Sequence, residues 1–212
     1  LVTHMPADDL KNVKAEFLLL NSNIAHQARE STKWGQEIPE DLFFSYVLPY
    51  ANLNETLESW RLDFFNKFYP MVKDMQSAYD AVIFLNQKIF DELGVIYSTK
   101  RPKADQSPYE SINAGMASCT GLSILLIDVC RSVGIPARFV GTPSWYNNSG
   151  NHSWVEIWDG EWHFTGAAEP TENRLNESWF EDLASKAEKG SDKYGIFAAT
   201  WEHTDIYFPM DW

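Results

Sequence analysis

The sequence predicts an α+β protein in which helices fill the first half of the chain and strands appear later. Three observations indicate this class. Apolar residues recur at close to 3.6-residue spacing over residues 10–30 and 76–93, as they do on one face of a helix. Residues 119–133 are apolar nearly all round, which is typical of a buried helix. Residues 153–165 contain alternating apolar positions around an Asp-Gly pair, which indicates a β-hairpin.

The size and composition of the chain fit one globular domain, or a core with an extension. Its 212 residues are 44% hydrophobic and 15% aromatic, which is enough for a substantial core. The net charge of −13 argues against a nucleic-acid partner, because phosphate binding needs clustered Lys and Arg. No stretch approaches the roughly 18 uninterrupted apolar residues of a membrane span, and no signal peptide is visible. The oligomeric state stays open.

Residues 1–74 are predicted to form a helical extension packed on the core. The periodic residues mark a first helix over 10–30. Pro39 followed by two acids marks the start of a second helix. Asn54 is a candidate N-cap for a third helix, which we expect to end before Pro70.

Residues 75–212 are predicted to form the core domain. Residues 76–93 are the clearest amphipathic helix, and Gly94 ends it. A polar loop at 98–109 leads toward the buried helix that begins at Cys119. The other expected elements are a short strand at 95–97, a strand at 138–140, a hairpin at 153–158 and 162–165 with its turn at Asp159-Gly160, a helix near 179–189 and a strand within 194–200.

Cys119 and His152 are the candidate catalytic residues. Cys119 lies at a helix N-terminus, where the helix dipole and unpaired N–H groups favour a thiolate. His152 follows 33 residues later, at the entrance to a strand. A nearby imidazole can hold the thiolate as an ion pair and then donate a proton to a leaving group. The pair predicts acyl-transfer chemistry with a cysteine nucleophile.

The second cysteine, Cys130, fits a buried structural role. On one helix, eleven residues separate the cysteines by about 16 Å, whereas a disulfide needs Cα atoms within about 7 Å. The redox compartment is therefore open, and an extracytoplasmic location (secreted or periplasmic) is favoured over the cytoplasm. One candidate Cys and one His fall short of the four ligands of a structural zinc, so we expect no metal site. The chemistry requires no cofactor.

Three segments in this order resemble the transglutaminase-like superfamily, which shares an ancestral core with papain-type cysteine peptidases. The segments are Cys119-Thr120-Gly121-Leu122-Ser123, Gly134-Ile135-Pro136-Ala137-Arg138 and His152-Ser153-Trp154-Val155-Glu156-Ile157-Trp158. The resemblance covers about residues 76–169. It implies a papain/transglutaminase-like core, with the nucleophile helix packed on an antiparallel sheet. It also implies a Cys-His-Asp triad that hydrolyses or transamidates amides.

The third member of this triad is missing from its usual place. The family's Asp usually comes four residues after the Trp of the returning strand, and counting from Trp162 gives Gly166. With the hairpin centred on the Asp-Gly turn, His152 faces the neighbourhood of Ala167, and Glu169 lies two residues further. We therefore predict that Glu169 orients His152. A Cys-His dyad and a catalytically inactive protein are the alternatives.

The backbone N–H of Cys119 is expected to form part of an oxyanion hole, which needs a second donor. Gln106 and Trp145 are the candidates, and Trp145 could instead wall a substrate groove. The predicted function is thiol-dependent acyl transfer on amide bonds, most simply hydrolysis of a peptide or protein substrate. Protein-glutamine transamidation is one alternative. A binding or scaffolding module that has lost catalysis is the other.

Overall fold

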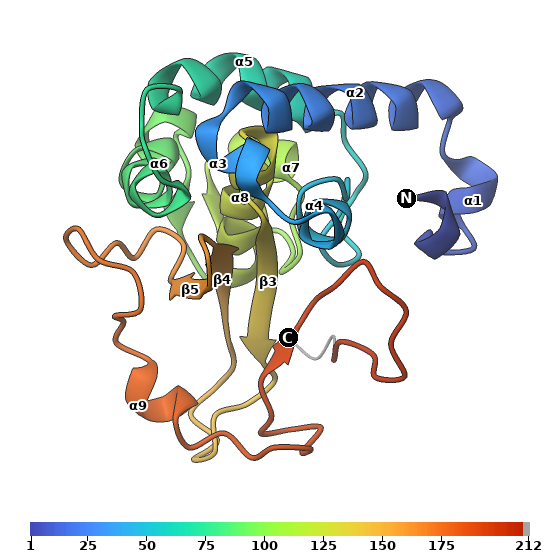
Figure 1. Cartoon of the computed structure of the whole chain (residues 1–212). Helices are drawn as coiled ribbons and strands as arrows, with labels where there is room; N and C mark the ends of the chain where they lie inside the picture. The colour runs from blue at the N-terminus through green and yellow to red at the C-terminus, as the bar shows by residue number, and fades with distance from the viewer. Residues whose placement is uncertain (210–212) are drawn as a thin grey trace.

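A computed structural model describes residues 1–209, so the last three residues of the predicted core domain lie outside the described part (Figure 1). In chain order the helices are η1 (Val2–His4), α1 (Asp9–Asn12), α2 (Ala15–Ser31), α3 (Lys33–Glu37), α4 (Glu40–Tyr46), α5 (Trp60–Val72), α6 (Ala78–Leu93), α7 (Pro108–Ala114), α8 (Cys119–Ser132) and α9 (Glu181–Ala184). The strands are β1 (Ile96–Tyr97), β2 (Met116–Ala117), β3 (Ala137–Thr142), β4 (His152–Trp158), β5 (Trp162–Thr165) and β6 (Phe197–Ala198).

The main sheet has four antiparallel strands in the order β5-β4-β3-β6, and α8 packs against it. A second, two-stranded parallel sheet joins β1 to β2, directly before Cys119. The predicted α+β class, with a buried helix packed on an antiparallel sheet, is confirmed.

Helix α8 is the centre of the core. Every residue of this helix after Cys119 is buried. The apolar side chains Leu122, Leu125 and Leu126 are at most 1% exposed, and burial of each contributes about 1.5–3 kcal/mol. An apolar surface on all sides therefore fixes α8 inside the protein and leaves only its first residue at a surface.

Helices α2 and α5 lie side by side across one end of the molecule, with α8 beneath them (Figure 1). Trp34, Trp60 and Phe68 join α8 in a single hydrophobic cluster. Residues on both sides of the predicted boundary at 74–75 therefore share one core. The division into an extension and a core domain stays a prediction.

Two expectations for the third helix are wrong. Helix α5 begins at Trp60, after Ser59, so Asn54 does not cap it. Pro70 lies inside α5 instead of beyond its end. A proline costs about 3 kcal/mol in a helix interior, but continuing the helix past Pro70 buries Val72 completely. Tertiary packing offsets the local penalty.

Two buried arginines connect the first 74 residues to α8. Arg61 donates from Nε to Asn21 (2.6 Å) and from Nη1 to the carbonyl of Arg131 (3.0 Å). Arg131 donates to the carbonyls of Ala51 (2.9 Å) and Ala137 (3.0 Å). Burial and the neighbouring Arg131 lower the pKa of Arg61 to about 9, so its guanidinium keeps its charge at pH 7.

The last part of the described chain carries less regular structure than predicted. The helix expected near 179–189 is limited to Glu181–Ala184, which contains no buried residue. A helix this short is marginal in water, and α9 contributes only the partly buried Leu183 and Ala184 to the cluster around Phe180. The strand expected within 194–200 consists of Phe197 and Ala198, which pair with Gly141 and Val140 of β3.

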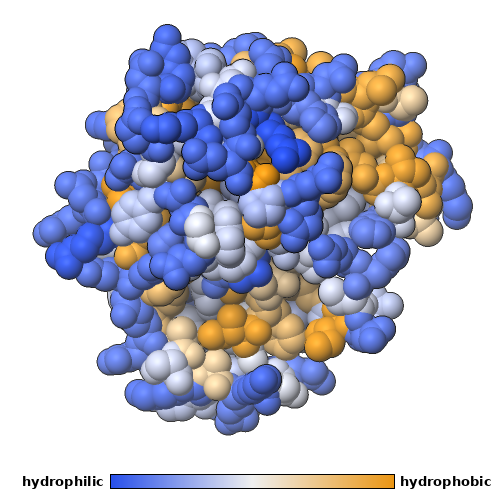
Figure 2. Space-filling view, in the orientation of Figure 1, coloured by the Kyte–Doolittle hydropathy of each residue, from blue (hydrophilic) through white to orange (hydrophobic). Residues whose placement is uncertain are grey.

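Hydrophilic side chains cover most of the face in Figure 2, as the net charge of −13 suggests. Apolar side chains gather on this face near α1 and α2, where Leu10 and Leu19 are exposed. Within residues 1–209, no helix combines the length and apolar character needed to cross a membrane.

Candidate active site

A cavity of about 220 Å³ lies where the first turn of α8 meets the start of β4. Cys119, His152 and Glu169 all line it, together with Trp179 and Arg101. Two hollows of about 510 and 600 Å³ lie elsewhere, and no cysteine lines either of them. The structure therefore brings the three predicted catalytic side chains into one small cavity.

Cys119 occupies the one position of α8 that is not buried. Strand β2 delivers the chain to Ser118, and the helix begins immediately after it. The first N–H groups of a helix have no partner within the helix, so that of Cys119 is available to an incoming oxygen. The thiol and a potential oxyanion donor thus belong to the same residue.

His152 is the first residue of β4 and pairs with Thr142 at the end of β3. It is 5% exposed, and its ring packs against Trp179 and Phe180 at centroid distances of 4.9 and 4.8 Å. These contacts restrict the plane of the imidazole before any substrate binds.

One hydrogen bond aligns the helix with the strand. The hydroxyl oxygens of Thr120 and Ser153 lie 3.3 Å apart and are both buried. These residues directly follow Cys119 and His152 in the sequence. The contact therefore sets the position of α8 along β4 at the level of the catalytic pair.

Burial lowers the pKa of His152 to about 4, so its imidazole is neutral at pH 7. The sequence had suggested an imidazolium paired with a thiolate, whereas the desolvated cavity favours the neutral ring. Its Nε2 is buried and has no hydrogen-bond partner within the described residues. The Glu169 Oε2 lies 3.7 Å from this nitrogen, which is longer than a hydrogen bond. Such contacts in unliganded enzymes often tighten when substrate binds.

The same oxygen of Glu169 accepts a hydrogen bond from the indole N–H of Trp179, at 2.9 Å. Burial raises the pKa of Glu169, and this hydrogen bond opposes the rise because it stabilises the carboxylate. Trp179 therefore contacts both His152 and Glu169 and holds the carboxylate toward the imidazole.

A tight turn brings Glu169 back to His152. In the β4–β5 ladder, Trp158 pairs with Trp162 at one end and Val155 pairs with Thr165 at the other. The chain then turns, and the Glu169 N–H donates to the Gly166 carbonyl (3.1 Å). The hairpin is centred on Gly160, so cross-strand partners shift by one residue from the predicted register.

The side chain of Glu169 occupies the space that a side chain at position 166 would need. A Cβ added at Gly166 would lie 2.9 Å from the Cβ of Glu169, and closer still to its Oε2. The glutamate side chain thus fills the volume into which a side chain at position 166 would point. This explains in steric terms how an acid at 169 can accompany a glycine at 166.

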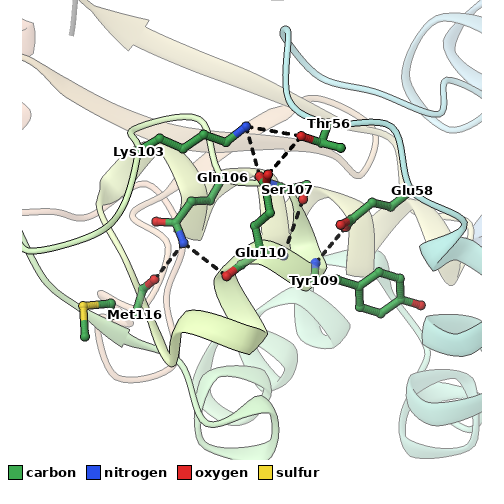
Figure 3. A network of polar contacts seen from close by, with 8 residues as sticks. All are labelled: Thr56, Glu58, Lys103, Gln106, Ser107, Tyr109, Glu110 and Met116. Atoms are coloured by element: carbon green, nitrogen blue, oxygen red, sulfur yellow. Dashed lines mark hydrogen bonds and ion pairs between the residues drawn. The ribbon is translucent and has the colours of Figure 1, made fainter.

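Gln106 is not brought into the cavity. It is 1% exposed, and its Nε2 donates to the carbonyls of Met116 (3.1 Å) and Glu110 (3.3 Å), as Figure 3 shows. Its amide donors are therefore occupied by the backbone. The side chain instead fixes the end of the loop that leads through β2 to Cys119.

Trp145 also lies outside the cavity. It is 3% exposed and stacks on Trp154, with 6.3 Å between ring centroids and 9° between ring planes. Its ring centroid is 6.0 Å from that of His152. Trp145 therefore supports the histidine from behind, and neither Gln106 nor Trp145 supplies a second oxyanion donor in this structure.

Asn86 is a positioning residue that the sequence interpretation missed. Its Nδ2 donates to Thr165 Oγ1 (3.0 Å) and to the Gly166 carbonyl (2.9 Å), and its Oδ1 accepts from the Ala168 N–H (2.9 Å). It holds the turn that carries Glu169. A signal existed, because a polar residue stands beside Leu85 on the otherwise apolar buried face of this amphipathic helix.

No local pattern indicates a role for Trp179, which lies in an irregular segment before α9. Its role depends on two contacts that only the folded chain creates.

Comparison with known proteins extends this description. Residues 69–167 match the family model of the transglutaminase-like superfamily. The matched range includes Cys119, His152 and Gly166, and it ends two residues before Glu169. No curated protein matches the sequence.

The fold resembles that of a solved structure at low sequence identity. A protein from Cytophaga hutchinsonii, provisionally described as a cysteine protease, has a TM-score of 0.52 and 19% identity. The alignment covers 68% of this chain and 48% of that one, so this chain spans about half the length of its relative. Legionella pneumophila LapG is more distant, with a TM-score of 0.38, 13% identity and coverage of 73% and 75%. The first comparison supports the fold alone.

Proposed function

Because residues 69–167 match the family model of the transglutaminase-like superfamily, we propose that the chain is a cysteine-nucleophile enzyme that hydrolyses amide bonds in a peptide or protein. The observation that carries this proposal is the shared cavity of Cys119, His152 and Glu169. The retention of all three groups in one place argues against a module that has lost catalysis.

The first half of the reaction forms a thioester. His152 takes the proton of the Cys119 thiol as the sulfur attacks the amide carbonyl carbon. The oxygen becomes an oxyanion and accepts a hydrogen bond from the Cys119 N–H. The imidazolium then gives its proton to the leaving amine as the C–N bond breaks. Since Nε2 faces Glu169, Nδ1 is the nitrogen that serves the sulfur.

The second half of the reaction hydrolyses the thioester and regenerates the free enzyme. His152 takes a proton from water, the hydroxyl attacks the thioester carbon, the C–S bond breaks to release the carboxylic acid, and the imidazolium returns its proton to the Cys119 sulfur. Transfer of the acyl group to an amine in place of water would give transamidation. The neutral ring at pH 7 suits both steps, because it begins each of them as the base.

Glu169 supports His152 during the charged stages. An imidazolium forms in each half of the reaction, and a nearby carboxylate stabilises it and fixes the ring tautomer. Once the ring carries a proton, the carboxylate of Glu169 attracts it. Burial keeps the imidazole neutral before the reaction, so it acts as a base when the thiol attacks. The nearby carboxylate then stabilises the imidazolium, which acts as the acid when the amine leaves.

The proposal is tested by alkylation of Cys119 with iodoacetamide across pH 5–9, read by peptide mass spectrometry. We expect reaction at pH 7 to be at least about tenfold faster in the wild type than in His152→Ala. Equal rates and ordinary thiol pH dependence in both proteins would contradict the enzyme proposal.

The reaction type needs a second measurement. A denatured protein substrate is incubated with the enzyme in the presence and absence of the amine dansylcadaverine. New peptide termini that require Cys119 indicate hydrolysis, whereas Cys119-dependent incorporation of the dye indicates transamidation. Fractionation of the native cells tests the extracytoplasmic location, which we retain as part of the proposal.

A further inference from the structure

Arg101 lies in the catalytic cavity because of the small parallel sheet. Strand β1 pairs with β2, and the Ser98 N–H donates to the Ala117 carbonyl at 2.9 Å. Parallel strands send both chains in the same direction. The segment after β1 therefore runs beside the start of α8, where Arg101 lines the same cavity as Cys119 and His152.

The guanidinium of Arg101 has an unused hydrogen-bonding edge. Its Nη1 donates to the Thr99 carbonyl at 3.2 Å, while its Nε is buried and has no hydrogen-bond partner within the described residues. Within residues 1–209, no carboxylate lies within the 4.0 Å of an ion pair with it. The lack of an acidic partner for Arg101 is unexpected by chance, because the chain has 30 acidic and only 17 basic residues.

The other cation of this loop behaves differently. Lys103 lies 3.0 Å from the Glu110 carboxylate and donates to Thr56, so its charge is compensated outside the cavity (Figure 3). Among the described residues, Glu169 is the one that brings a carboxylate to the cavity lining, and it is held by Trp179 and faces His152. Arg101 is thus a cation in the cavity that no acid of the described chain neutralises.

We propose that Arg101 binds a carboxylate of the substrate close to the scissile amide. A planar guanidinium can hold a carboxylate through two parallel hydrogen bonds, and that of Arg101 donates to one acceptor among the described residues, the Thr99 carbonyl. This inference rests on the proposed function and specifies its substrate class. The carboxylate can belong to an acidic side chain or to the free C-terminus of a short peptide.

Two alkylating reagents of nearly equal size test this proposal without any known substrate. Iodoacetate carries a carboxylate and iodoacetamide a neutral amide; with each, the Cys119 thiolate forms an S–C bond and iodide leaves. The ratio of the two rate constants therefore reports how strongly the cavity attracts a carboxylate. We expect Arg101→Gln to lower the ratio of iodoacetate to iodoacetamide by about fivefold, and Arg101→Lys to lower it less.

Lys103→Gln is the matched control, because it removes the same charge from the same loop outside the cavity. We expect its ratio to equal that of the wild type. An unchanged ratio in Arg101→Gln, or an equal fall in both variants, would overturn the proposal. His152→Ala changes the reaction with both reagents together. A wrong histidine mechanism would therefore show in the rates with both reagents, whereas a wrong carboxylate site would show only in the ratio of the two rates.

Two isomeric probes distinguish the sources of the carboxylate. N-acetylglutamine has only a terminal carboxylate, and N-acetylglutamic acid 1-amide has only a side-chain carboxylate. Protection of Cys119 from iodoacetamide by the first supports a free C-terminus, and protection by the second supports an acidic side chain. In either case the protection must be lost in Arg101→Gln and kept in Lys103→Gln. No Arg101-dependent protection by either probe would overturn the proposal.

Discussion

At the scale of single residues, Gly166 and Glu169 share one volume, and this predicts the effects of exchanging them. Gly166→Ala should displace the Glu169 carboxylate, because the new Cβ would contact it. Glu169→Ala should slow amide cleavage or Cys119 alkylation at pH 7, by about 10²-fold at most. The double variant Gly166→Asp/Glu169→Ala moves the acid to the position where the family usually has it.

We expect this double variant to recover part of the lost rate, measured as alkylation of Cys119 with iodoacetamide. Gly166→Asn/Glu169→Ala is the control, since it has a similar side chain without the charge. Equal rates in the Asp and Asn variants would show that no carboxylate assists His152.

A second prediction concerns the pH dependence of stability. The pKa of His152 is about 4 in the folded protein and about 6.5 when unfolded. Between these values the unfolded chain binds more protons, so the stability contributed by the neutral buried ring is lost as pH falls from 6.5 toward 4. The full loss is about 3 kcal/mol.

Urea unfolding at pH 7.0 and 4.5 measures this effect in the wild type and in His152→Gln, which cannot titrate. The wild type should lose more stability on acidification than the variant. Parallel losses in the two proteins would mean that His152 is not buried in its neutral form.

At the scale of elements, one helix supports the turn that carries the acid. Asn86→Leu removes three hydrogen bonds from α6 to the 165–168 turn and leaves the partly buried Ala168 N–H without its partner. We expect a loss of about 2–3 kcal/mol of stability, together with slower alkylation of Cys119. Urea unfolding and the alkylation assay provide the two readouts.

Gln87→Leu is the control for this variant, because Gln87 is the next residue of the helix and is exposed. Its stability should change by less than about 0.5 kcal/mol. If the two variants behave alike, the turn does not depend on Asn86.

The elements differ in how far the sequence predicts them. The periodicity of residues 78–93 and the all-round apolar surface of 119–132 specify helices, because burial and local pattern agree there. The start of α5, the proline inside it and the length of α9 depend on packing between distant segments. The hairpin was predicted, but its turn is centred on Gly160, and this shifts every cross-strand pair by one residue.

The residues of the candidate site also divide into those that local sequence patterns predict and those that depend on tertiary contacts. Cys119 and His152 are visible in the sequence because their chemistry depends on local positions, a helix N-terminus and a strand entrance. The position of Glu169 near His152 could be predicted from the geometry of the hairpin. Trp179, Asn86 and the unused edge of Arg101 gain their roles only through tertiary contacts, which no local pattern encodes.

At the scale of the whole molecule, the buried arginine network predicts that the first 74 residues are required for folding. Arg61→Met keeps the side-chain volume but removes bonds to Asn21, Arg131 and two further carbonyls. We expect a loss of about 3–5 kcal/mol in urea unfolding. Lys67→Met, an exposed change on the same helix, should cost far less.

The isolated segment 75–212 should likewise fail to fold, since it lacks the Ala51 carbonyl that accepts from Arg131 and exposes the α8 surface that α5 covers. Amide proton dispersion by nuclear magnetic resonance measures this. A well-dispersed spectrum of the segment would establish that the extension is dispensable.

The burial of α8 beyond its first residue has a practical consequence for counting molecules. Cys119 and Cys130 are the two thiols of the chain, and burial raises the pKa of Cys130. A chromogenic disulfide reagent should therefore release one equivalent from the native protein and two after denaturation. That stoichiometry gives the fraction of chains with an intact site, in a single absorbance reading and before any substrate is known.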